Sequence, residues 1–200
     1  MKSNIFKYLA AVAMATATLT SSYALSLTPT SLPLGSPVAS ETLSFTGNGF
    51  AGVPSGSLYS AVYNVSGKYT FVYQLTDTGA SSITELTLNG FIPSVGVTTL
   101  GYVTGNTDPK TATLLGSGNL QVGFDTSGNG IGIPASGGLS DYLVVATTAT
   151  AYLNNFPAGV IDGGVAPANA YGPTVPDGGM TIMLLGGALS GMALLRRKLA

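Results

Sequence analysis

Residues 57–76 read SLYSAVYNVSGKYTFVYQLT, and this stretch decides which fold the sequence predicts. In residues 57–65 and again in residues 68–76, side chains two positions apart share a face, and aromatic and β-branched residues are frequent, as in β-strands. The pair Ser66-Gly67 lies between the two runs, and a two-residue loop of this composition is typical of a β-hairpin. We therefore predict two antiparallel strands joined by a tight turn.

Six further runs have strand-like composition and are separated by turn residues at short intervals. They are residues 41–46, 83–91, 97–103, 111–115, 120–124 and 142–153. No window between them keeps the 3.6-residue apolar period of a helix for three turns. The sequence therefore predicts an all-β domain over residues 41–165, an antiparallel β-sandwich of jelly-roll-like type, with a β-barrel as the alternative.

The composition excludes several classes of function. Only 8% of the residues are charged, and Cys, His and Trp are absent. Without Cys and His there are no disulfides, no metal sites built from these ligands and no catalytic triads with a histidine base. Residues 25–175 carry two lysines against seven carboxylates, a net charge of −5. Such a segment does not neutralise a row of phosphates, so no nucleic-acid partner is expected.

The first 24 residues have the three parts of a secretory signal peptide. Lys2 and Lys7 precede a mostly apolar run over residues 8–19, and a small-x-small sequence ends at Ala24. Twelve residues rise only about 18 Å as a helix, which is too short for a hydrocarbon core of about 30 Å. We predict cleavage after Ala24, with an uncleaved anchor as the alternative, and an extended lead-in over residues 25–40.

The C-terminal end has the pattern of a stop-transfer segment. Residues 180–195 contain no charge and are predicted to form a transmembrane helix. The basic cluster Arg196, Arg197 and Lys198 follows at once, within the tail 196–200. Cations beside an apolar helix stay on the cytoplasmic side. Because a cleaved signal peptide places the preceding chain across the membrane, the domain is expected to be exported.

A short motif stands directly before this helix, in a linker predicted over residues 166–179. It reads Val175, Pro176, Asp177, Gly178, Gly179. The order of motif, short glycine-bearing span, basic cluster and chain end resembles the PEP-CTERM class of bacterial sorting signals. Its VPDSG-CTERM variant is the most similar form, and Gly178 stands where that variant has serine.

This resemblance implies a route and a partner. Family members are exported, held transiently in the inner membrane by the tail, and then processed by an exosortase, an integral membrane enzyme of the cysteine-protease kind. The processed protein passes to the cell surface or extracellular matrix of bacteria that make exopolysaccharide. The alternative is a plain C-terminal anchor behind a Pro-Gly linker, which would leave a membrane-tethered periplasmic domain.

Two patterns of acidic residues are candidate sites. Glu41 and Glu85 are the only glutamates, and a glycosidase needs two facing carboxylates. Both fall in predicted strands, which favours solvated strand faces. Residues 125–130 resemble the start of a calcium loop, but Ser136 stands where the bidentate carboxylate is needed, so a glycine-rich turn is favoured.

Five aromatic residues of the central hairpin are candidates for a face that stacks on sugar rings: Tyr59, Tyr63, Tyr69, Phe71 and Tyr73. Because sugar platforms rely heavily on Trp, packing on a core is favoured, with a carbohydrate-binding module as the alternative. The sequence thus predicts no catalytic, cofactor-binding or metal-binding residues. It predicts a non-enzymatic surface or matrix protein, associated with exopolysaccharide.

Overall fold

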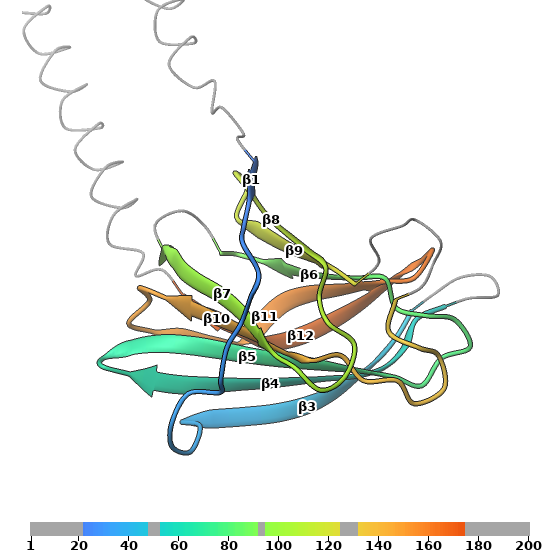
Figure 1. Ribbon diagram of the computed structural model, residues 1–200, viewed down its shortest axis with the longest axis horizontal. Coiled ribbons are helices and arrows are strands. Elements are labelled where there is room, and N and C mark those ends of the chain that lie inside the picture. The colour runs from blue at the N-terminus through green and yellow to red at the C-terminus, as the bar shows by residue number, and fades with distance from the viewer. Residues whose placement is uncertain (1–21, 48–52, 92–94, 125–131, 175–200) are drawn as a thin grey trace, which may run out of the picture.

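The computed structural model describes residues 22–47, 53–91, 95–124 and 132–174 (Figure 1). These residues form two six-stranded sheets, consistent with a β-sandwich, so the all-β prediction is confirmed. The strands are β1 (Ser22–Ala24), β2 (Thr28–Pro29), β3 (Ala39–Thr46), β4 (Ser55–Val65), β5 (Lys68–Asp77), β6 (Glu85–Asn89), β7 (Val97–Val103), β8 (Thr111–Leu115), β9 (Asn119–Gly123), β10 (Tyr142–Thr147), β11 (Tyr152–Ile161) and β12 (Val165–Pro173).

The chain crosses between the two sheets several times. Sheet A has the order β1-β8-β9-β6-β11-β12, and sheet B has the order β2-β7-β10-β5-β4-β3. All neighbouring strands are antiparallel except β2 and β7, which run parallel, so the prediction of a purely antiparallel sandwich is wrong at this edge. Between β1 and β2 the lead-in crosses from sheet A to sheet B.

The central hairpin is confirmed. Strands β4 and β5 pair from Val65 opposite Lys68 along their whole length. Ser66 and Gly67 both have positive φ angles, 55° and 79°, as the two-residue turn that matches strand twist requires. The Gly67 N–H donates to Asn64 Oδ1 at 2.9 Å. Local chemistry therefore sets the register of this pair.

The predicted single strand over residues 142–153 is wrong, because it spans a crossing between sheets. Strand β10 ends at Thr147 in sheet B, and β11 begins at Tyr152 in sheet A. At the crossing the Thr147 hydroxyl donates to the Tyr69 carbonyl at 2.8 Å. The Thr148 hydroxyl donates to the Val95 carbonyl at 2.6 Å. Threonine has good strand propensity, so its role in ending a strand is not visible from composition.

The predicted linker over residues 166–179 is also wrong for its first half. Residues 165–173 form β12, which pairs with β11 and buries Ala166 and Ala170 completely. Pro167 and Pro173 are tolerated because β12 is the last strand of its sheet and has only one ladder partner. The folded domain therefore extends almost to residues 175–179, the predicted sorting motif.

The core lies between the sheets and is mostly aliphatic. Three phenylalanines cross it in edge-to-face contacts: Phe71–Phe91 has ring centroids 6.1 Å apart, and Phe91–Phe156 has them 5.3 Å apart. Both sheets contribute fully buried side chains: Leu58, Phe71, Tyr73 and Leu75 from sheet B, and Leu86, Leu88, Leu120 and Val122 from sheet A.

The two sheets are linked by hydrogen bonds at one side and by the N-terminal strands at the other. At the β3–β12 side, the Tyr73 hydroxyl donates to the Tyr171 carbonyl at 2.7 Å, and the Tyr171 N–H donates to Ser60 Oγ at 3.1 Å. At the other side, β1 pairs with β8 of sheet A and β2 pairs with β7 of sheet B. Figure 1 shows this blue segment running from β1 down the side of the sandwich. The segment from β1 to β2, which includes the start of the predicted lead-in, therefore joins the edges of the two sheets on this side.

Candidate functional site

The residues that carry the sorting prediction lie outside the described part of the chain. They are the motif Val175–Gly179, the apolar run 180–195 and the basic cluster Arg196, Arg197 and Lys198. Among the residues described, there is no helix that is both long and apolar enough to cross a membrane. The calcium-like loop at residues 125–130 is also outside the described residues.

The predicted cleavage residue, Ala24, is the last residue of β1. It lies opposite Thr113 of β8 and is exposed. The next residue is already attached to the domain, since the Leu25 N–H donates to the Ala112 carbonyl at 2.9 Å and the Leu25 side chain packs on the core. Cleavage after Ala24 would remove β1, leave Leu25 in place and make β8 the edge of sheet A.

The five hairpin aromatics lie on two opposite faces of sheet B, so they do not form the single sugar-stacking face considered from the sequence. Strand pairing places Tyr59 opposite Gln74 and Tyr63 opposite Thr70, on the outer face of sheet B. Tyr69, Phe71 and Tyr73 point the other way, into or against the main core. With Val65 opposite Lys68, even-numbered positions of β4 face odd-numbered positions of β5, and this separates the two groups.

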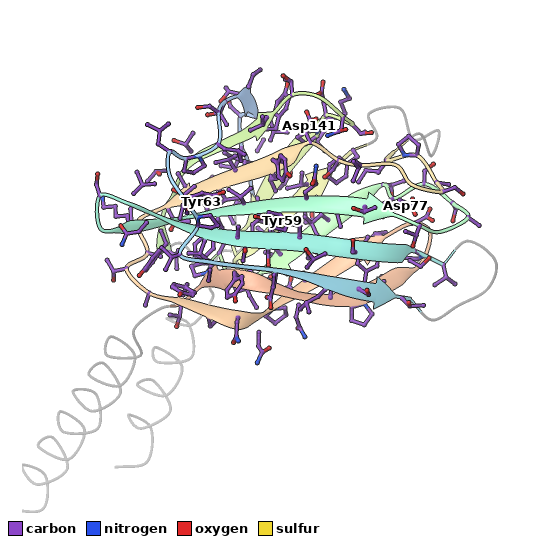
Figure 2. All side chains as sticks on the ribbon, turned by 90° about the horizontal axis from the view of Figure 1, so that it is seen from below. Tyr59, Tyr63, Asp77 and Asp141 are labelled. Carbon is purple, nitrogen blue, oxygen red and sulfur yellow. The ribbon has the colours of Figure 1, made fainter. Side chains whose placement is uncertain are left out.

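The two tyrosines on the outer face, Tyr59 and Tyr63, pack against neighbouring side chains instead of lying open to solvent. Tyr63 is only 8% exposed and forms a small outer cluster with Ala61, Val72 and Val144, against which Leu32 of the lead-in packs. Tyr59 meets Tyr142 edge to face, with ring centroids 6.0 Å apart. Figure 2 shows Tyr59 and Tyr63 on the face of the sheet turned to the viewer. This arrangement favours a packing role over stacking on a flat sugar ring.

The two glutamates are on different sheets, one on an inward-facing side of its strand and the other on an outer face. Glu41 is at an inward-facing position of β3, on the same face as Ala39 and the buried Phe45. Its Oε1 is buried without a hydrogen-bond partner. Glu85 is on the outer face of sheet A, where its Oε1 accepts a hydrogen bond from Thr87 Oγ1 at 3.1 Å. They do not form a facing pair. An inward charge on an edge strand such as β3 discourages pairing with another chain.

Two aspartates are buried, which the sequence did not indicate. Asp77 is fully buried at the end of β5, and its carboxylate accepts from the Gly79 N–H at 2.7 Å and the Ile83 N–H at 3.2 Å. Burial raises the pKa of Asp77, and these two hydrogen bonds oppose the rise. From the sequence, Asp77 is expected to be an ordinary turn aspartate. Its place at a strand end before Thr-Gly fits that interpretation but does not reveal burial.

The second buried aspartate, Asp141, precedes β10. Its Oδ1 accepts from the Asn106 N–H at 2.5 Å, while its Oδ2 is buried without a hydrogen-bond partner. Asp108 lies close by and is itself paired with Lys110, whose Nζ is 3.6 Å from Asp108 Oδ2. Figure 2 shows Asp77 and Asp141 at separate places on the molecule. The fold therefore brings Asp108 and Asp141 together, although they are 33 positions apart in the sequence.

The stability of the domain is expected to rise on mild acidification. Burial raises the pKa of Asp77 above 3.8 and that of Glu41 above 4.5. A carboxyl with a higher pKa in the folded state binds its proton more tightly when folded, so it stabilises the fold at low pH and loses that contribution as pH rises through the folded pKa. The melting temperature can be measured by circular dichroism, with a chelator present to remove metal ions. It should be higher at about pH 5 than at about pH 7.5.

The variant Glu41→Gln should flatten this dependence, because the amide is neutral throughout and Oε1 has no donor to lose. A melting temperature that falls steadily from neutral pH to about pH 5 would contradict the assignment.

Comparison of the chain with family models, curated proteins and solved structures finds no match.

Proposed function

We propose that this chain is an exported cell-surface or matrix protein, released from the inner membrane by an exosortase-type protease acting near Val175–Gly179. The observation that carries the proposal is the fixed order of motif, apolar run and basic cluster in the last 26 residues. Each part has a physical task. The motif is read, the apolar run holds the chain in the bilayer, and the cations stop translocation.

The folded domain supports the proposal by where it ends. Strand β12 ends at Pro173, and only residues 174–179 separate it from the apolar run. Six extended residues span at most about 20 Å. The uncut protein would therefore hold its β-sandwich within about that distance of the membrane surface. This leaves the motif accessible to an enzyme embedded in the same bilayer.

The sequence of the motif suits proteolysis. Pro176 removes a backbone N–H and disfavours helix at Val175. The glycines at 178 and 179 add conformational freedom before the apolar run. A protease binds its substrate extended, so a segment that resists helix formation is a better substrate than a continuous helix.

The domain is proposed to act without catalysis, as a component of a polysaccharide-containing surface layer. The support is its composition: residues 25–175 have a net charge of −5 and no Cys or His. The hairpin tyrosines do not favour the carbohydrate-binding alternative, because they are divided between two faces and packed.

The test is the mass of the mature protein. Protein recovered from the cell surface of the producing bacterium should begin at Leu25 and lack residues 180–200, and both ends can be read by intact-mass and peptide analysis. Surface protein that still carries the C-terminal peptide would contradict processing and indicate a plain anchor. Protein retaining Met1 would show that the first segment is not a cleaved signal.

A further inference from the structure

The loop between β7 and β8 folds around Asp141. The Asn106 N–H donates to Asp141 Oδ1, and the Asp141 N–H donates to the Thr107 carbonyl at 3.0 Å. Thr107 also forms a bridge with Ser140, whose hydroxyl accepts from the Leu75 N–H at 2.9 Å. The backbone on both sides of Asp141 is therefore held in place, and its carboxylate cannot swing out to water.

The Asp141 carboxylate is buried, and one of its oxygens has no hydrogen-bond partner. Asp141 is 1% exposed, and its Oδ2 has no hydrogen-bond donor. The Asp108 carboxylate lies beside that of Asp141. Burial and this neighbour raise the pKa of Asp141, whereas the backbone N–H groups of Asn106 and Gly105 lower that pKa. Lys110 contacts Asp108 from the partly exposed side at 3.6 Å. A buried carboxylate beside another carboxylate is costly unless a proton or a cation lies between them.

We propose that Asp141 Oδ2 and the carboxylate of Asp108 bind a divalent cation of the calcium class in the loop between β7 and β8. The donor set is oxygen only, which suits Ca²⁺ rather than zinc or copper. No group of three or more acidic side chains is found among the described residues, so any further ligands would have to be backbone carbonyls or water. The site is distinct from residues 125–130, where the sequence resembled a calcium loop.

The competing arrangement needs no metal. In it the two carboxyls share one proton, and Lys110 neutralises the remaining charge through Asp108. The two arrangements differ in what Lys110 does: beside a bound cation its ammonium is repelled and competes, whereas in the metal-free arrangement it is the stabilising partner. The variant Lys110→Gln therefore separates them.

The experiment uses Tb³⁺, a luminescent substitute for Ca²⁺, with the purified full-length chain. The chain has ten tyrosines and no Trp, and Tyr142 directly follows Asp141, so tyrosine excitation should sensitise bound Tb³⁺. Ca²⁺ should displace the signal and, when added alone, raise the melting temperature by several degrees, because a ligand that binds only the folded state stabilises it. Asp108→Asn should weaken Tb³⁺ binding at least tenfold.

Glu85→Gln is the matched control, since it removes one acidic charge on the outer face of sheet A and should change Tb³⁺ affinity less than twofold. Lys110→Gln should bind Tb³⁺ as well as the unaltered chain or better. The proposal is overturned if Tb³⁺ does not bind, or if Asp108→Asn and Glu85→Gln have equal effects. It is also overturned if Lys110→Gln abolishes binding. Melting temperatures without metal identify variants that fail to fold.

Discussion

Replacing Pro176 and Asp177 together with alanine is expected to trap most of the full-length chain in the inner membrane. Neither residue lies in the apolar run 180–195, so insertion should be unchanged. The double change removes the proline that disfavours helix and the one charge of the motif. An apolar helix flanked by cytoplasmic cations does not leave the bilayer intact, so delivery outward depends on a cut before it. Loss of the cut should therefore convert a surface protein into a membrane protein.

The measurement is fractionation of the producing cells, with the chain length determined in each fraction. Two control variants separate sorting from anchoring. Thr181→Ala changes the residue after Met180 without touching the motif, and it should mature normally. Replacing Arg196, Arg197 and Lys198 with neutral residues should instead weaken topology and retention before processing. Normal maturation of the Pro176/Asp177 double variant would show that the tail is a plain anchor.

The second large effect is expected from Gly172→Ala in β12. A Cβ built on Gly172 would lie 2.0 Å from Cγ of Phe156, and one built on Gly90 would lie 2.8 Å from Cε2 of the same ring. Phe156 is 2% exposed and in edge-to-face contact with Phe91, so its ring occupies a slot between two glycines. Overpacking of this kind costs about 1–3 kcal/mol, because the ring cannot move without displacing its neighbours.

For a chain of this size such a cost lowers the melting temperature by roughly 2–12 °C. Gly164→Ala, in the turn before β12, is the matched control, since its only neighbour within 4 Å is Pro54 Cδ at 3.9 Å. That change should leave stability within about 0.5 kcal/mol of the unaltered protein. Thermal unfolding followed by circular dichroism compares the two. Equal melting temperatures would mean that Phe156 does not occupy the slot.

Where local chemistry decides the structure, the sequence was sufficient. The ranges predicted at 97–103 and 111–115 coincide with β7 and β8, and the hairpin turn is at Ser66-Gly67. The division of the tyrosines also follows from that turn. A two-residue loop pairs Val65 with Lys68, and counting back places Tyr59 opposite Gln74. The alternation within each strand does not show this division, because it depends on the register between the two strands.

Where pairing between distant segments decides the structure, the sequence was not sufficient. Strand β12 has three prolines or glycines among its nine residues and was predicted as linker. It is a strand because β11 supplies its ladder partner and because alanines at 166 and 170 fit where the sheets approach closely. Alanine and proline have low intrinsic strand propensity, so nothing local identifies the element.

The sequence by itself determined the all-β class and the central hairpin. The signal peptide and sorting tail that it indicates at the two ends stay predictions, because their meaning depends on a membrane and an enzyme rather than on the fold. Only the tertiary structure decided that residues 22–30 strap the two sheets together and that Asp108 approaches the buried Asp141. The physical reason is the range of the interactions involved. Periodicity and turn chemistry act over a few residues, whereas burial and strand pairing join segments that the linear sequence keeps far apart.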